Sequence, residues 1–153
     1  MTETQRLIDQ IERAFSGNAW HGPSLSEALR DVTAAEAACR NVPKAHTIWE
    51  IVLHLISDSS MVARRLRGER ADLTEDESWP AVLDQTDASW KRAMHELEAK
   101  QKELMQQLSV SDEIDLDRPI VANYASIYRT LHGHVSHMIY HAGQIIVLRK
   151  AAL

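Results

Sequence analysis

Hydrophobic residues recur every three or four positions along four long stretches of this chain, which is the period of an amphipathic helix. Residues that cap helices stand at the ends of two of these stretches: Thr2 and Thr47 precede them, and Gly17 and Gly68 follow them. Residues 110–124 are rich in aspartate and predict a loop, with a short extended piece near Ile120. The pattern therefore predicts four helices, over residues 2–16, 47–67, 84–109 and 125–150.

The connection between the first two predicted helices is long and contains helix signals of its own. Ser24 with Glu27, and Thr33 with Glu36, have the spacing of a capping box, in which two side chains each accept a hydrogen bond from the other residue's backbone N–H. We therefore expect two short helices here. A connection of this length, residues 17–45, is able to cross a helical bundle.

Four long helices without a convincing pair of strands indicate an all-α protein, and their number predicts a four-helix bundle. Glycine and proline are scarce inside the helical stretches, which supports the same fold class. The 153 residues fit one domain, residues 1–153. Because the first connection is long enough to cross the bundle, the helices need not follow a simple up-down-up-down course.

Composition and charge narrow the classes of partner. Hydrophobic residues make up 44% of the chain and charged residues 25%, as in soluble globular proteins. The net charge of −5 disfavours a nucleic-acid partner, because phosphate binding needs a concentrated basic face, and no stretch is apolar enough to predict a membrane partner. The single cysteine, Cys39, excludes an internal disulfide and predicts a cytoplasmic protein. Its alanine-rich surroundings predict a small buried residue rather than a nucleophile.

The candidate chemistry lies in the last predicted helix, where four of the eight histidines fall within residues 132–141. His137 and His141 are four residues apart, so they share one helical face and are able to bind the same metal ion. His134 and His137, three apart, form the other plausible pair. Either pair needs a third ligand from elsewhere in the chain. Elimination among the other histidines leaves His54 as the best candidate.

The remaining histidines are interpreted as structural or exposed. His134 lies in the middle of an apolar stripe, which predicts a buried histidine that is hydrogen-bonded to a neighbour. His95 and His132 lie on polar helix faces and are expected to be exposed, whereas His21 and His46 stand at the edges of elements.

Three stretches resemble the DinB/YfiT-like superfamily of metal-dependent enzymes: residues 20–25 (WHGPSL), 46–54 (HTIWEIVLH) and 137–145 (HMIYHAGQI). The resemblance extends over nearly the whole chain. It implies a four-helix bundle with an up-down-down-up course and a metal site with the ligands His54, His137 and His141. Many members have arginine where this chain has Ala142, so any function of that arginine is absent here.

The resemblance implies either a hydrolase or a thiol transferase that acts on a small molecule, such as a low-molecular-weight thiol. Three neutral imidazoles leave the 2+ charge of an ion in place and leave coordination positions open. Such an ion lowers the pKa of bound water to about 7, or holds a thiol as thiolate. Zinc, nickel and iron all suit imidazole ligands. The alternative function is a non-catalytic, stress-related module for binding or dimerisation.

Two further expectations concern the predicted helix over residues 47–67. Glu50 and Asp58 lie one turn before and one turn after His54, where each is a candidate to orient a ligand imidazole or to transfer a proton, or else a solvated helix charge. Leu53 and Ile56 widen the apolar stripe of this helix, which, with the family's tendency to pair, predicts a homodimer.

Overall fold

The computed structural model describes residues 1–109 and 114–152, and the regular secondary structure in this part of the chain is helical. Within these residues no β-strand forms, and the only extended pairing is an isolated bridge between Pro119 and Ser126. The prediction of an all-α protein is therefore confirmed. The long helices are α1 (Glu3–Ser16), α4 (Ile48–Leu66), α6 (Asp87–Ser109) and α7 (Ile127–Lys150), and the short ones are α2 (Leu25–Leu29), α3 (Ala34–Ala38) and α5 (Glu75–Ser78).

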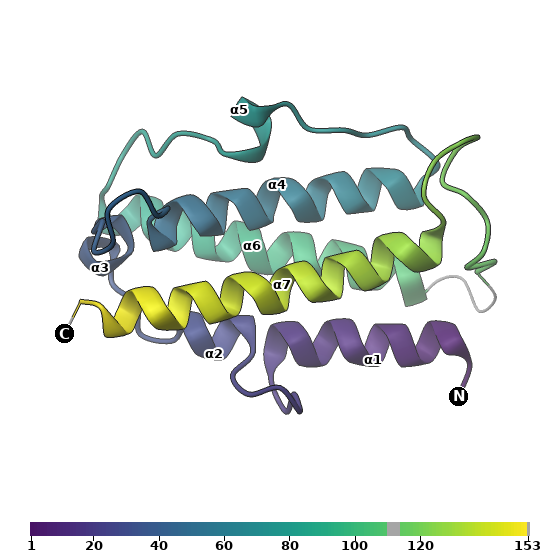
Figure 1. Ribbon diagram of the computed structural model, residues 1–153, viewed down its shortest axis with the longest axis horizontal. Coiled ribbons are helices and arrows are strands. Elements are labelled where there is room, and N and C mark those ends of the chain that lie inside the picture. The colour runs from purple at the N-terminus through teal and green to yellow at the C-terminus, as the bar shows by residue number, and fades with distance from the viewer. Residues whose placement is uncertain (110–113, 153) are drawn as a thin grey trace.

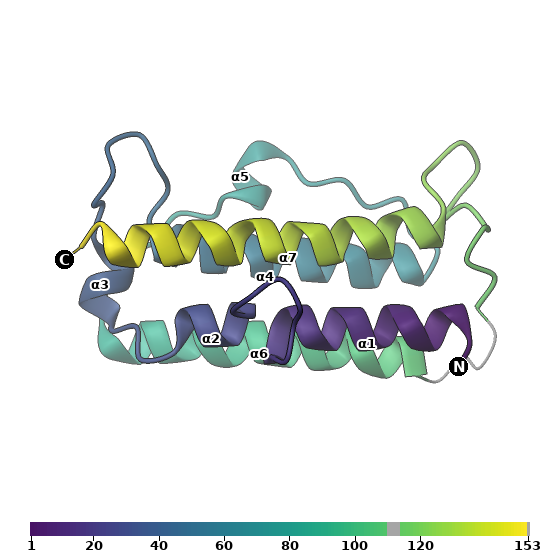
Figure 2. The same ribbon diagram turned by 60° about the horizontal axis from the view of Figure 1, so that its bottom comes forward.

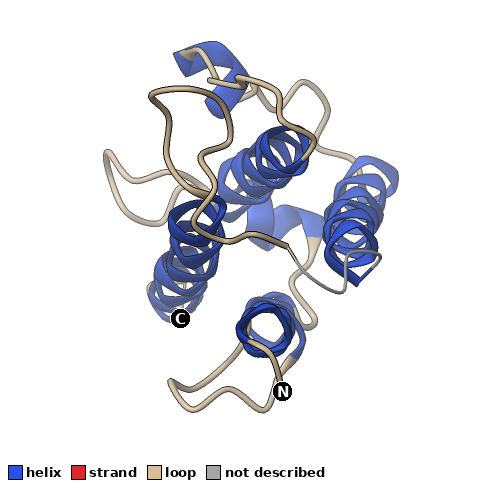
Figure 3. Cartoon of the chain, turned by 90° about the vertical axis from the view of Figure 1, so that its right-hand side faces the viewer, coloured by secondary structure: helices blue, strands red, loops and turns tan. Residues whose placement is uncertain are grey.

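The four long helices lie side by side with their axes roughly parallel (Figures 1 and 2). The colours of Figure 1 show that α4 and α6 run in one direction and that α1 and α7 run in the other. In the end-on view of Figure 3, these four helices surround a common centre. Such a course needs one return along the length of the bundle, from the end of α4 to the start of α6, because these two consecutive helices run in the same direction.

The first long connection carries α2 and α3, and hydrogen bonds attach it to the bundle. The indole Nε1 of Trp90 in α6 donates to the backbone oxygen of Val32 at 2.8 Å. Arg149 in α7 donates to the backbone oxygen of Ala28 at 2.9 Å. Both acceptors are carbonyl groups of the connection, so α6 and α7 together hold the connection in place.

The second long connection, residues 67–86, is called the strap here. It contains α5 and runs along the outer side of α4 (Figure 1). Gly68 begins it with a φ of +82°, a conformation that L side chains rarely adopt, and this glycine stops α4 where the sequence predicted. A capping box of Thr74 and Glu77, which the sequence analysis did not identify, starts α5.

The helix boundaries follow the capping residues closely. Capping boxes begin α1, α2, α3 and α4, at the four residues that the sequence predicted as caps: Thr2, Ser24, Thr33 and Thr47. The third long helix begins at Asp87 rather than at residue 84, and the fourth begins at Ile127 with Ser126 as its cap. The predicted loop is observed over residues 114–124, where Ile120 donates to the backbone of Ala125, while residues 110–113 lie outside the described residues.

The core consists of large aliphatic side chains from the inward faces of the long helices. The largest fully buried ones include Ile11 of α1, Leu55 of α4, Leu104 of α6 and Ile145 of α7. Burial of each such side chain stabilises the fold by about 1.5–3 kcal/mol relative to its exposure. Among the described helices, none combines the length and the apolar character needed to cross a lipid bilayer.

Two expectations about burial need correction. Cys39 is exposed rather than buried, because it follows the last residue of α3 and so leaves the apolar face of that helix. Ile56 is only 7% exposed within the single chain, because the side of α4 on which it lies packs against the bundle, and Leu53 is partly buried against the same core. These two residues therefore do not form the exposed apolar surface that suggested a homodimer.

Candidate metal centre

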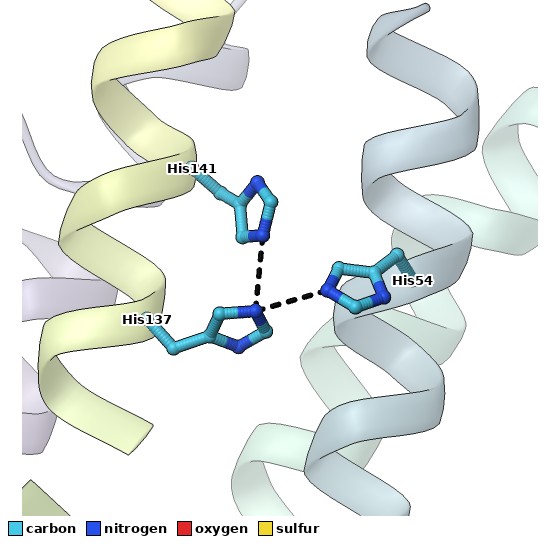
Figure 4. A group of neighbouring side chains, drawn as sticks. All are labelled: His54, His137 and His141. Carbon is cyan, nitrogen blue, oxygen red and sulfur yellow. Dashed lines mark hydrogen bonds between the residues drawn. The ribbon is translucent and has the colours of Figure 1, made fainter. Parts of the chain in front are cut away.

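Three histidines from two helices converge at the middle of the bundle. His54 comes from α4, and His137 and His141 come from α7 (Figure 4). The Nε2 atom of His137 lies 2.9 Å from Nε2 of His54 and 3.0 Å from Nε2 of His141. One nitrogen from each ring lies within 4.8 Å of the others, so the three close histidines could hold a metal ion.

The helices themselves position these rings. The four-residue spacing of His137 and His141 places one ring a turn above the other, with ring centroids 4.5 Å apart. His54 reaches the pair from the facing helix, because α4 and α7 pack directly on each other. His54 is 8% exposed and His141 is 3% exposed, whereas the His137 side chain keeps 26% of its surface in contact with solvent. The centre is thus accessible mainly at His137.

Each ring has an oxygen partner on the side away from the cluster. Nδ1 of His54 donates to the backbone oxygen of Ser78 in the strap at 2.7 Å. A carbonyl oxygen only accepts hydrogen bonds, so Nδ1 of His54 carries the proton and Nε2 keeps its lone pair. The Nδ1 atom of His141 lies 2.7 Å from Oε1 of Gln144, which is the same arrangement.

The third ring completes this pattern with a carboxylate. Nδ1 of His137 lies 3.1 Å from Oδ2 of Asp58, although the two atoms are not aligned as a hydrogen bond. When the proton of each ring is on Nδ1, it faces an oxygen, and the three Nε2 lone pairs then point at one another. Lone pairs at such separations repel unless a cation lies between them. The donor set fits one divalent ion, since neutral imidazole nitrogens with oxygen partners on their other nitrogen are the usual ligands of such ions.

Asp58 and Glu50, which the sequence treated alike, are in different environments. Burial raises the pKa of Asp58, but the hydrogen bond from His134 and the contact with His137 lower it more, so its pKa lies well below the usual range. Glu50 instead accepts from the backbone N–H of Thr47 at 2.7 Å and pairs with Arg40 at 2.7 Å. Asp58 is thus the carboxylate next to the candidate ligands, whereas Glu50 caps α4.

Burial also keeps two of the candidate ligands neutral. Burial first, and the neighbouring His137 second, lower the pKa of His141 to about 4. The pKa of His54 is lowered as well, chiefly by burial, although the bond to Ser78 opposes the shift. A metal ion binds only the neutral form of imidazole, so both shifts favour metal binding at neutral pH.

The strap supplies a contact that sequence reasoning missed. The indole ring of Trp79 lies between two imidazoles: it stacks on His54 at a centroid distance of 4.0 Å and on His46 at 3.6 Å. Ser78 and Trp79 thereby contact the same ligand ring, one at its edge and one on its face. By itself the sequence SWP predicts the start of a helix, since proline suits a first helical turn, but in the structure α5 ends at Ser78. Nothing local signals that these residues lie over His54.

The other histidines lie where the pattern predicted. His134 is buried, and its Nδ1 atom lies 3.1 Å from Oδ2 of Asp58 in a hydrogen bond. His95 and His132 are exposed, and neither joins the cluster. His21 is exposed in the loop before α2, and His46 packs against Trp79.

The fold and the site together define an all-helical protein whose long helices bring three histidines to one point. A family model described as the DinB superfamily matches residues 19–145, so the chain belongs to the DinB superfamily. The match includes all three histidines of the cluster and every element from α2 to most of α7. The comparison with curated proteins and the comparison with solved structures each gave no match.

Proposed function

We propose that this protein is a metal-dependent enzyme that acts on a small molecule, with His54, His137 and His141 as the ligands of one divalent ion. The observation that carries the proposal is the convergence of three Nε2 atoms, each from a ring whose Nδ1 faces an oxygen. Membership of the DinB superfamily supports it, because the superfamily is commonly metal-binding.

When bound, the ion (zinc, nickel or iron) would supply a Lewis acid that makes a bound water or thiol more acidic. The residues of this chain hold the ligands in place. Ser78 and Gln144 keep the proton of His54 and of His141 on Nδ1. Asp58 faces Nδ1 of His137, and Trp79 covers the face of His54. Such support fixes both the tautomer and the orientation of a ligand imidazole.

Two reactions suit this centre: hydrolysis, and transfer of a low-molecular-weight thiol to an electrophile. In both, a nucleophile loses its proton beside the histidines. Asp58, the carboxylate nearest to them, already contacts His134 and His137, so its proposed role is to position His137 rather than to accept that proton. The exposed edge of His137 is the side from which either nucleophile would approach.

The first experiment measures metal in protein purified without an affinity tag. We expect about one divalent ion per chain by mass spectrometry of the elements, and no such ion in the triple variant of His54, His137 and His141 to Ala. The variant His95→Ala is the matched control, because this exposed histidine lies outside the cluster. Metal-free protein of unchanged stability would instead favour a non-catalytic binding or dimerisation module.

A second experiment separates the two reactions. The protein is loaded with Co²⁺, whose absorption spectrum reports its ligands, and is then titrated with 2-mercaptoethanol. A new sulfur-to-metal band that saturates supports thiol transfer, because the thiol has then bound as thiolate. A spectrum that responds to pH but not to thiol supports hydrolysis.

A further inference from the structure

A cavity of about 330 Å³ lies beside the candidate metal centre, between α4 and the first half of α7. It is called the His137 cavity here. Asp58 and Met61 of α4 line it, together with Arg129, Thr130, Gly133 and His137 of α7. Its volume is near the lower end of the range for small-molecule sites, about 300–1,000 Å³.

The His137 cavity adjoins the accessible side of the histidine cluster. His137 lines it, and His137 is the candidate ligand whose side chain is 26% exposed. The larger groove on the other side, about 650 Å³, is lined by Gln144 and His46 but by none of the three clustered histidines. Of these two, only the His137 cavity brings a small molecule into contact with the cluster.

Three buried polar atoms of residues in the cavity wall have no hydrogen-bond partner among the described residues. They are Oγ1 of Thr130, a residue that is 8% exposed, Nε2 of His134, whose side chain has no exposed surface, and Nδ1 of His137, which lies beside Asp58. A buried polar atom without a partner costs about 1–3 kcal/mol. Of these atoms, the Thr130 hydroxyl is free to donate to a polar molecule in the cavity, whereas Nε2 of His134 only accepts, because that ring donates from Nδ1 to Asp58.

The wall of the His137 cavity also includes a positively charged side chain, Arg129, in an unfavourable position. Arg129 lies in the first turn of α7, where the helix dipole disfavours positive charge, and that turn carries no acidic residue. Within residues 1–109 and 114–152, no carboxylate forms an ion pair with Arg129. Arg65, the other arginine of the wall, is occupied by the backbone oxygen of Ala71, Asp72 and Tyr124. Arg129 is thus available to an anion from outside the chain.

We propose that the His137 cavity is the substrate site of the metal centre and that it takes a small organic carboxylate. The inference rests on the proposed function. The carboxylate pairs with Arg129 and accepts from Oγ1 of Thr130, while the rest of the molecule lies along Met61 and Val62 toward His137. Arg129 and His137 are eight residues apart, about 12 Å along the helix at 1.5 Å per residue. The substrate therefore carries its anionic group at the end away from its reacting group.

The test uses hexanoate as a probe and its uncharged isostere hexanamide as a control. Both are titrated into the full-length protein as purified, and the backbone amide signals of Thr130, Gly133 and His134 are followed by NMR. We expect saturable shifts with hexanoate, with a Kd on the order of millimolar, and at least about tenfold weaker binding of hexanamide. In Arg129→Gln, the two probes should bind with the same affinity. The control Arg118→Gln removes the same charge outside the cavity, so hexanoate should still bind more tightly than hexanamide.

A pair of glycine variants tests the location. A Cβ at Gly133 or at Gly143 meets no atom within 4 Å, so a larger side chain fits at either position. Gly133→Leu fills the His137 cavity and should abolish hexanoate binding, whereas Gly143→Leu fills the groove on the other side and should leave binding unchanged. Equal binding of the two probes, or binding that survives both Arg129→Gln and Gly133→Leu, overturns the proposal. Metal content, measured on the same samples, decides the proposed function separately.

Discussion

Asp58 of α4 and His134 of α7 form a hydrogen-bonded pair behind the candidate metal centre, with Oδ2 of Asp58 3.1 Å from Nδ1 of His134. The same oxygen lies 3.1 Å from Nδ1 of His137. One carboxylate oxygen therefore contacts a histidine that faces the cluster and a second histidine that does not. The pair links the stability of the bundle to the orientation of a candidate ligand.

The first prediction concerns that buried histidine. His134→Ala should lower the free energy of unfolding by about 1–3 kcal/mol, because it removes buried packing and leaves Asp58 with one partner fewer. Metal content should stay the same, since His134 is not among the three clustered rings. Chemical denaturation and elemental analysis measure the two quantities. Loss of metal without loss of stability would mean that His134 is itself a ligand.

The second prediction concerns the ligand from α4. His54→Ala should reduce metal affinity sharply, because it removes one of three converging nitrogens and leaves only the pair on α7. His95→Ala and His132→Ala, which change exposed histidines, should leave the affinity unchanged. Competition with a chelator of known affinity gives the values. Wild-type affinity in His54→Ala would rule out the three-histidine site.

The third prediction concerns the strap. Trp79→Leu should lower stability by about 1–3 kcal/mol and weaken metal binding, because the indole stacks on His54 and its neighbour Ser78 accepts the His54 Nδ1 proton. Trp20→Leu is the control, since the side chain of Trp20 is fully exposed. Denaturation curves and metal titrations of both variants provide the comparison. Equal effects of the two substitutions would show that the stacking contributes nothing specific.

The fourth prediction concerns pH. Burial lowers the pKa of His141 to about 4 from an ordinary value of 6.5, so the unfolded chain takes up a proton at a pH where the folded chain does not. The metal-free protein should therefore lose stability as the pH falls from about 6.5 to 4, by on the order of 2–3 kcal/mol. His141→Gln should flatten this dependence. Metal binding to the folded protein should weaken only as the pH approaches about 4, where His141 itself takes up a proton.

The fifth prediction concerns assembly. We propose a homodimer, although Ile56 does not provide its surface, because Ile56 is buried within the chain. Exposed apolar residues lie instead on α7, where Tyr140 and Val147 are each 62% exposed. Light scattering at micromolar concentration should give twice the mass of the chain, and Tyr140→Lys combined with Val147→Lys should reduce it. A monomer mass for the unaltered protein would remove the proposal.

The four long helices, and those helix ends that carry capping residues, are properties that the sequence determined by itself. The capping box of Thr47 and Glu50 and the stop at Gly68 bracket α4 as predicted, because both depend on residues within a turn of the helix end. The pairing of His137 with His141 is equally local, since four residues on a helix always return to the same face. The burial of His134 followed from its place in an apolar stripe.

The surroundings of the site depended on contacts between distant parts of the chain, and only the tertiary structure decided them. From the residues alone, His54 was chosen by elimination, and only the packing of α4 on α7 brings its Nε2 to 2.9 Å from His137. Asp58 and Glu50 lie one turn either side of His54, and the sequence did not distinguish them. In the structure Asp58 faces α7, whereas Glu50 caps its own helix. Ser78 and Trp79 gave no signal, because their role arises where the strap crosses α4. Helical periodicity specifies which face a residue occupies, but the packing of the helices determines what that face meets.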